Sequence, residues 1–194
     1  MKIYDISQEI FNCVVYPGDT APKAKKVRRT DKGDTYNLTD ITMCVHNGTH
    51  IDAPFHFLGD GKTVDMIPIE KTVGICYVAE FCGKLGADDA LTILNMAGNE
   101  AGRRILIKGD VIVTREAANV FSGYSIDLIG VESQSVGEPS GPMEVHKIFL
   151  EKDVVILEGL RLDAVEAGEY FLNATPINFG GIDGAPCRAI LIRK

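Results

Sequence analysis

The sequence predicts a mixed α/β fold. Segments rich in valine and isoleucine, which are typical of strands, alternate along the chain with segments of helical periodicity. No internal repeat occurs at a constant period, so a repeat architecture is not expected. The chain has 194 residues, of which 45% are hydrophobic and 24% are charged, and these are ordinary globular values. We therefore expect a single α/β domain over residues 1–194.

The expected strands share alternating or continuous apolar runs. In chain order they are Ile3–Ile6, Asp40–Val45, Gly74–Glu80, Arg104–Ile107, Val111–Thr114, Ser125–Gly130, Val154–Leu157 and Arg188–Ile192.

Helical periodicity is weaker but present. It predicts helices over Ala87–Ala97, Arg115–Phe121 and Pro142–Leu150, and a shorter helical turn over Asp163–Ala167. The helix at Pro142 opens with proline in its first turn, where the missing N–H leaves no hydrogen bond unmade.

Charge and cysteine content limit the partners and the compartment. With 20 basic and 27 acidic residues the net charge is -7, which argues against a nucleic-acid partner. Neither a signal peptide nor a membrane span is expected from the apolar runs. Five cysteines are an odd number and form no CxxC pair, so we expect reduced thiols in the cytoplasm.

Three of the four histidines lie within eleven residues. The segment reads His46-Asn47-Gly48-Thr49-His50-Ile51-Asp52-Ala53-Pro54-Phe55-His56. Imidazole and carboxylate are the usual ligands of zinc and related divalent ions. The four residues that could bind a metal, His46, His50, Asp52 and His56, occupy even positions, so an extended strand would place them on one face. A helix would also pair His46 with His50, but Gly48, Thr49, Ile51 and Pro54 argue against it. Cys44 also has an even number and would lie on the same strand face, although a cysteine more often serves as a small, buried apolar residue.

A functional metal site normally needs a further ligand from elsewhere in the chain. The fourth histidine, His146, lies on the predicted helix Pro142–Leu150. Glu158 follows twelve residues later, at the carboxyl end of the predicted strand Val154–Leu157. Because α/β folds often place their sites at strand ends, these two residues could complete one metal site or build a second beside it.

The segment from His46 to His56 resembles the signature His-x-Gly-Thr-His-x-Asp-x-Pro-x-His of the cyclase or bacterial kynurenine formamidase family of metal-dependent hydrolases, and it matches that signature without a departure. Further blocks are similar to the family on both sides of it. They are Tyr4-Asp5-Ile6-Ser7, Tyr16-Pro17-Gly18-Asp19, Leu128-Ile129-Gly130, Glu158-Gly159-Leu160 and Gly184-Ala185-Pro186-Cys187-Arg188.

The resemblance implies a two-metal centre. His46, His50 and Asp52 would hold one ion and His146 the other, with Asp52 and Glu158 able to bridge the two. His56 would be the proton shuttle. The resemblance also implies the swivelling β/β/α type of fold and a homodimer or higher oligomer, such as a tetramer. Zinc is the metal it implies for the formamidase branch, and manganese for the related isatin hydrolases.

The implied chemistry explains these residue types. A divalent ion lowers the pKa of bound water from about 15.7 toward about 7, which supplies hydroxide at neutral pH and polarises the carbonyl under attack. A histidine with a pKa near 6.5 can then deliver a proton to the leaving nitrogen. His56 suits that role. The resemblance thus implies an amidohydrolase, with N-formylkynurenine, an intermediate of tryptophan catabolism, as the expected substrate.

Two departures bear on the substrate. Tyr16 stands where the formamidases carry tryptophan, and it could either stack on a substrate ring or simply pack. Asp19 is expected to be a turn residue. The segment 131–137 also differs from the formamidase pattern. The alternatives are therefore an isatin-hydrolase-like enzyme that opens a cyclic amide, and a metal- or ligand-binding protein that has lost turnover.

Overall fold

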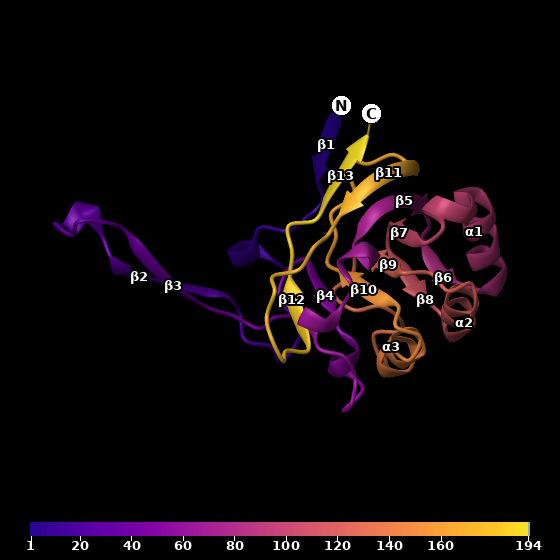
Figure 1. The fold of residues 1–194 in the computed structure, drawn as a ribbon, viewed down its shortest axis with the longest axis horizontal. Helices are drawn as coiled ribbons and strands as arrows, with labels where there is room; N and C mark the ends of the chain where they lie inside the picture. Colours follow the sequence, from indigo (N-terminus) through magenta and orange to yellow (C-terminus); the bar gives the residue numbers. More distant parts are fainter. Residues whose placement is uncertain (194) are drawn as a thin grey trace.

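Figure 1 shows a strongly curled mixed sheet with helices packed on one side of it. The structure is a computed structural model that describes residues 1–193. Within these residues the strand order of the main sheet is β1-β13-β11-β5-β7-β9-β10-β4-β12. Its strands are β1 Lys2–Asp5, β4 His50–Asp52, β5 Val73–Glu80, β7 Arg104–Lys108, β9 Leu128–Val131, β10 Val155–Glu158, β11 Gly168–Asn173, β12 Gly184–Pro186 and β13 Ile190–Arg193.

The middle of the sheet is parallel and both of its ends are antiparallel. Strands β5, β7, β9 and β10 run parallel to one another. Strands β7, β9 and β10 consist mainly of isoleucine, leucine and valine, as expected for strands that are covered on both faces. Strand β4 joins β10 in antiparallel register, and β12 then pairs with β4.

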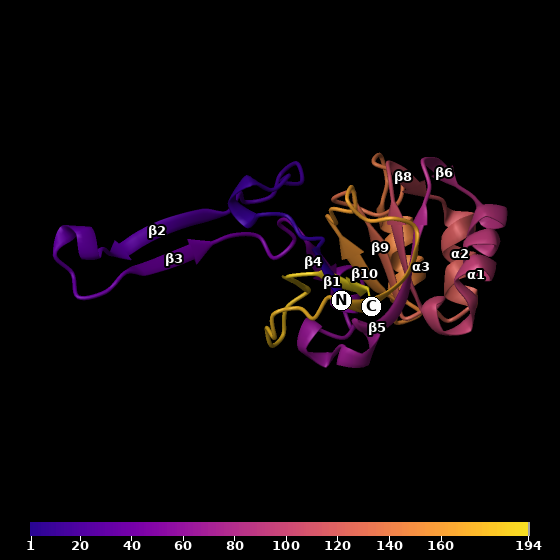
Figure 2. The ribbon, with the colours of Figure 1, turned by 90° about the horizontal axis from the view of Figure 1, so that it is seen from above.

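Three helices cover one face of the sheet in the described part of the chain (Figure 2). They are α1 Ala87–Ala101, α2 Arg115–Gly123 and α3 Met143–Leu150. Phe121 of α2 and Phe149 of α3 are fully buried against Ile105 and Ile129 of the sheet. A second core lies on the opposite face, where the sheet curls over Leu106, Leu128 and Leu157. No helix within residues 1–193 is long and apolar enough to cross a membrane.

A two-stranded ribbon projects away from this body, at the left of Figure 2. Its strands are β2 Lys23–Arg28 and β3 Leu38–Thr42, and every residue of both strands is exposed. We call residues 23–42 the arm. A further small parallel pair joins β6 Gly83–Leu85 to β8 Val111–Val113 beside the helices.

Most expected elements are present, and their type is right. The predicted strand Asp40–Val45 ends early, at Thr42, because the chain then leaves the arm and enters the turn that carries His46. Strands β2, β6, β11 and β12 were not predicted. At Asp163–Ala167 the structure has a single turn, closed by the Val165 N–H on the Leu162 carbonyl, instead of a helical segment.

The prediction of one extended strand from His46 to His56 is wrong over most of its length. Only His50–Asp52 is a strand, whereas His46 lies in the preceding turn and His56 in a 3-10 helix, Pro54–His56. Gly48 at φ 65° reverses the chain before the strand, and Pro54 opens the helix after it. The histidines therefore converge through two bends, and only His50 and Asp52 share a strand face.

Candidate metal centre and active site

The turn before β4 is tied to two distant segments. The Thr49 hydroxyl donates a hydrogen bond to the carbonyl of Gly159 at 2.6 Å and accepts one from the Gln8 N–H at 2.9 Å. Thr49 is buried, and its carbonyl accepts the N–H of Cys187. These bonds fix the start of β4 and thereby the position of His50.

Strand register brings the buried acids to His50. In the antiparallel pair of β4 and β10, His50 lies opposite Glu158. His50 Nε2 is 3.4 Å from Asp52 Oδ1, two residues along the same strand face, and 3.4 Å from Glu158 Oε2. All three side chains are almost completely buried.

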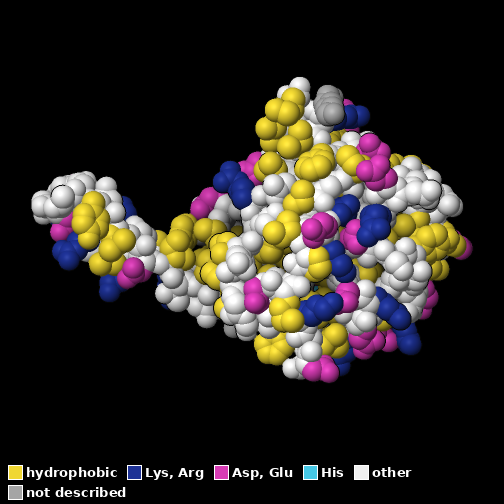
Figure 3. Space-filling view, viewed as in Figure 1, with side chains coloured by type: hydrophobic (Ala, Val, Ile, Leu, Met, Phe, Trp, Pro, Cys, Tyr) yellow, Lys and Arg dark blue, Asp and Glu magenta, His cyan; other side chains and the backbone are white. Residues whose placement is uncertain are grey.

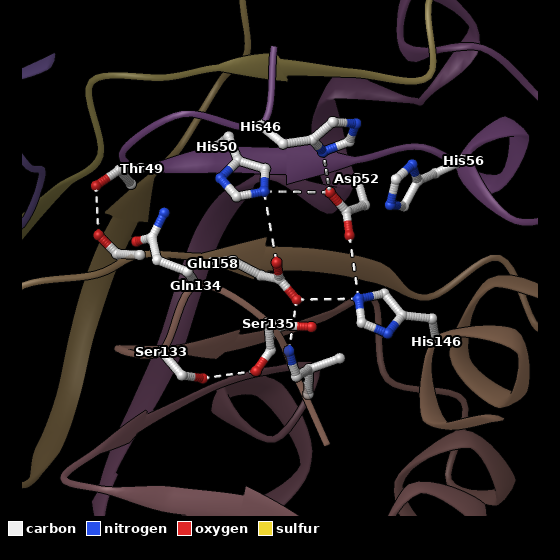
Figure 4. A network of polar contacts seen from close by, with 12 residues as sticks. His46, Thr49, His50, Asp52, His56, Ser133, Gln134, Ser135, His146 and Glu158 are labelled. Carbon is white, nitrogen blue, oxygen red and sulfur yellow. Dashed lines mark hydrogen bonds and ion pairs between the residues drawn. The ribbon is translucent and has the colours of Figure 1, made fainter. Parts of the chain in front are cut away.

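His146 reaches the same acids from α3 (Figure 4). Its Nε2 lies 3.1 Å from Glu158 Oε1 and 3.5 Å from Asp52 Oδ2. Glu158 Oε1 is held in place by the N–H of Val136 at 2.6 Å. The two carboxylates thus lie between His50 and His146.

The hydrogen bonds of the two histidines suit metal ligation. His50 Nδ1 donates to the carbonyl of Gly48 at 3.0 Å, and His146 Nδ1 donates to the carbonyl of Pro142 at 2.9 Å. In the neutral rings this leaves both Nε2 lone pairs facing carboxylate oxygens, which a cation between them would satisfy. Asp52 Oδ2 is buried, makes no hydrogen bond of normal length and has its contact with His146 Nε2 at 3.5 Å. The donor set and this weakly paired oxygen therefore fit a divalent metal.

The buried carboxylates shift the pKa values of the histidines beside them. Burial alone would lower the pKa of His146, but hydrogen bonds to Asp52 and Glu158 outweigh it and raise that pKa to about 10. The same balance raises the pKa of His50 well above its usual value. Burial would raise the pKa of Asp52, yet its histidine partners hold it well below its usual range. Without a metal, protons on the histidines offset the acids.

His46 and His56 lie on the more open side of the site. His46 Nδ1 is 2.9 Å from Asp52 Oδ1, and its Nε2 is 2.8 Å from Asp183 Oδ2. His56 Nδ1 is 3.3 Å from the same oxygen of Asp183. Burial lowers the pKa of His56, and the charges of His46 and His146 add to this effect, which outweighs the opposing influence of Asp52 and Asp183. His56 is therefore suited to carry a neutral ring at neutral pH.

These side chains open into a cavity of about 240 Å³. The residues lining it are Tyr16, Asp19, His46, His50, His56, Phe57, Gln134, Ser135, Pro142, His146 and Glu158. The Asp19 N–H donates to the Tyr16 carbonyl, so this segment is the expected turn, and both residues also reach the cavity. The volume suits a small molecule.

Donor atoms lie within 4.8 Å of one another in three groups of the described residues. One group is His46, His50 and Asp52, the second is Asp52, His146 and Glu158, and the third is His46, His56 and Asp183. Asp52 belongs to the first two groups, so these could hold two neighbouring ions that share one carboxylate.

The structure brings all the residues singled out in the sequence to one place. His46, His50, Asp52, His56, His146 and Glu158 form one cluster, and Tyr16 lies on the cavity wall. Sequence reasoning missed Asp183 and Phe57, and it noted Gln134 and Ser135 only as part of the segment 131–137, without assigning them to the site. Asp183 was visible only as part of a glycine-rich turn, and nothing in its local pattern marks it as a partner of two histidines.

Comparisons with known proteins agree with this architecture. The family model described as "Putative cyclase" matches residues 4–183. Kynurenine formamidase from Erythrobacter litoralis (strain HTCC2594) is 32% identical over 98% of this chain and 93% of its own length. A solved structure described as a potential metal-dependent hydrolase with cyclase activity is 29% identical, covers 100% of this chain and 98% of its own, and has a TM-score of 0.85.

Isatin hydrolase A from Labrenzia aggregata, bound to benzyl benzoate, shares the fold at a TM-score of 0.86. It is 20% identical over 100% of this chain and 94% of its own. The α/β fold expected from the sequence is therefore confirmed. From the family match over nearly its whole length, together with the formamidase relative, it follows that the chain belongs to the cyclase family.

Proposed function

We propose that the protein is a metal-dependent amidohydrolase of the arylformamidase type, which converts N-formylkynurenine to kynurenine and formate. The observation that carries this proposal is the buried cluster in which His50 and His146 direct Nε2 toward Asp52 and Glu158. The kynurenine formamidase relative, 32% identical over nearly the full chain, supports the choice of substrate.

The proposed centre holds two divalent ions, with zinc favoured over manganese. His46, His50 and Asp52 would hold one ion and His146 the other, with Asp52 and Glu158 able to contact both. When bound, the ions supply an activated water and polarise the amide carbonyl. Three imidazoles and two carboxylates suit zinc, and manganese remains compatible with the carboxylates.

This chain's own residues account for the remaining steps. His56 accepts a proton from the attacking water and returns it to the leaving nitrogen, for which a neutral ring is needed at the start. The lowered pKa of His56 favours that neutral ring. Tyr16 lies beside the substrate ring as an aromatic wall. Equal effects of Tyr16→Ala on aromatic and aliphatic amides would remove Tyr16 from this role.

A substrate panel tests the proposed function. Wild-type protein loaded with zinc or with manganese is assayed on N-formylkynurenine, isatin and an N-formyl aliphatic amine. The proposal predicts the highest kcat/KM for N-formylkynurenine. Higher turnover of isatin would favour opening of a cyclic amide, which needs the same activated water. No turnover of any amide with either metal would leave a binding protein of the same fold.

We further propose a homodimer or higher oligomer in the cytoplasm. The arm exposes Val27, Tyr36, Leu38 and Ile41, and an isolated two-stranded ribbon is only marginally stable in water. The arm has six basic and three acidic residues, a net charge of +3, so the remainder of the -7 chain carries -10. Figure 3 shows the arm standing clear of the body, with apolar, basic and acidic side chains along it. A second copy of the chain offers both apolar surface and opposite charge.

Five free cysteines agree with a reducing compartment.

A further inference from the structure

Asp183 contacts two of the site histidines at once. Its Oδ2 lies 2.8 Å from His46 Nε2 and 3.3 Å from His56 Nδ1. The two imidazole rings lie against each other, with centroids 4.1 Å apart and planes inclined by 35°. A single carboxylate oxygen of Asp183 is therefore within hydrogen-bond distance of one ring nitrogen of each histidine.

The backbone around Asp183 fixes this oxygen in place. The Asp183 carbonyl accepts the N–H of Ala53 at 2.9 Å, and the next residue, Gly184, pairs with Asp52 in the register of β12 and β4. A Cβ atom on Gly184 would lie 2.8 Å from His46 Cε1 and 2.7 Å from the Ile51 carbonyl oxygen. Only glycine permits this close approach, so strand pairing and Gly184 together bring Asp183 to both rings.

If each ring donates its N–H to Asp183, the other nitrogen of each ring is free. A neutral imidazole that donates its N–H from one nitrogen has its lone pair on the other. In His46, donation from Nε2 to Asp183 leaves the lone pair on Nδ1, which lies 2.9 Å from Asp52 Oδ1. In His56, donation from Nδ1 to Asp183 leaves the lone pair on Nε2, while the ring lines the cavity.

We propose that Asp183 is a positioning residue that holds His46 ready to bind metal through Nδ1 and His56 ready to accept a proton through Nε2. It acts through these two rings and does not itself bind the metal. This inference rests on the proposed function, because it assigns His56 the proton transfer. Carboxylates that orient metal-bound histidines are a common device, and their loss typically costs about 10- to 100-fold in metal affinity or activity.

The most direct test needs no variant. In zinc-loaded wild-type protein labelled with ¹⁵N-histidine, the nitrogen shifts report which nitrogen of each ring carries the proton. The proposal predicts a protonated Nδ1 and an unprotonated Nε2 for His56, and a protonated Nε2 for His46. The opposite pattern in His56 would overturn it.

Asp183→Asn then separates positioning from ligation. At saturating zinc the variant should keep its full metal content while kcat on N-formylkynurenine falls about 10- to 100-fold, with a smaller change in KM. The His56 nitrogen shifts should change in the same variant. The matched control is Asp65→Asn, because Asp65 accepts the Gly181 N–H of the same loop and the amide oxygen preserves that bond. The control should retain wild-type kcat and wild-type His56 shifts.

The role of Asp183 and the proposed amidohydrolase activity can fail independently of each other. Wild-type kcat and unchanged His56 shifts in Asp183→Asn would overturn it, as would loss of one zinc equivalent, since that would make Asp183 a metal ligand. If the wild-type protein hydrolyses no amide, the proposed function fails. The histidine shifts and the zinc content of the variant then still decide the role of Asp183.

Discussion

His50 and His146 use their ring nitrogens in the same way. Each donates Nδ1–H to a backbone carbonyl and directs Nε2 at the same two acids. The carbonyls of Gly48 and Pro142 thereby select the tautomer that a metal requires. In the absence of a metal, the nearby carboxylates attract protons to these nitrogens instead, which raises the pKa of both histidines.

Metal uptake should therefore release protons and weaken as the pH falls. His146 has a pKa of about 10 in the metal-free protein, so at pH 7 its Nε2 carries a proton that the ion must displace. Apparent zinc affinity should rise steadily between pH 6 and pH 8. Calorimetry in buffers of different ionisation enthalpy measures the released protons. An affinity independent of pH, with no proton release, would contradict the protonated state of this cluster.

His56 and His50 should fail in different ways when replaced by alanine. His56→Ala should keep its metal and lose about 10²- to 10⁴-fold in kcat, because it removes the proposed proton-transfer group and none of the proposed metal ligands. His50→Ala should lose metal and activity together, because it deletes a buried side chain proposed to bind the metal. Metal content and turnover are measured on the same samples. Equal metal loss in both variants would make His56 a ligand.

The sequence contains the ligand types but not all of their partners. His46, His50, Asp52 and His56 were recognisable because four metal-type residues lie within eleven positions. Asp183 lies 127 positions beyond His56, and only the pairing of β12 with β4 brings it near. Such a contact depends on tertiary structure, so a single sequence with one aspartate in a glycine-rich turn could not predict it.

At the scale of elements, two bends and a short strand form the site. The even spacing of the histidines is compatible with a strand. Gly48 and Pro54, however, interrupt the extended backbone on either side of the three-residue strand β4. The central strands were recognisable from their buried apolar runs, and the helices Ala87–Ala97, Arg115–Phe121 and Pro142–Leu150 from a weaker helical periodicity. The arm strand β2 was missed because its six exposed residues include four basic ones and little apolar pattern.

Gly48→Ala should disturb the turn that carries the ligands. Gly48 has φ 65°, and an alanine Cβ there would lie 3.0 Å from Ile10 Cδ1. A left-handed conformation costs an L-residue about 1–2 kcal/mol, so the free energy of unfolding should fall by about that much. Zinc affinity should fall as well, since the Gly48 carbonyl holds His50 Nδ1.

Gly33→Ala is the matched control for this change. Gly33 has φ 91° on the arm, and a Cβ there would meet no atom within 4 Å. It should cost comparable stability without affecting zinc binding. Thermal unfolding and a competition assay for zinc measure both variants. Equal zinc affinities for the two would show that the turn does not position the ligands.

For the whole molecule, the arm is connected directly to the cavity wall. Tyr16 and Asp19 precede β2, and β3 leads through Met43 to His46. Both ends of the arm thus continue into segments that line the site. An arm packed on a second copy would therefore also restrain the Tyr16 side of the substrate cavity.

Charge reversal on the arm should weaken association. Lys23 and Lys26 lie opposite Thr42 and Thr39, so replacing both lysines with glutamate leaves the cross-strand pair of Lys25 and Asp40 intact. Sedimentation velocity should show a shift toward monomer. The control is Lys147→Glu with Lys152→Glu, two exposed lysines at the helical face. Identical sedimentation of both double variants and wild type would remove the arm from the interface.

We expect the buried histidines and carboxylates to bind divalent metal, and the proposed hydrolysis depends on it. Elemental analysis of protein purified without chelator tests it most directly. The donor groups that share Asp52 predict about two zinc or manganese ions per chain, and Asp52→Ala should abolish this content. A wild-type protein that holds no divalent metal, and takes up none with sub-micromolar affinity, would show that these residues do not form a metal centre.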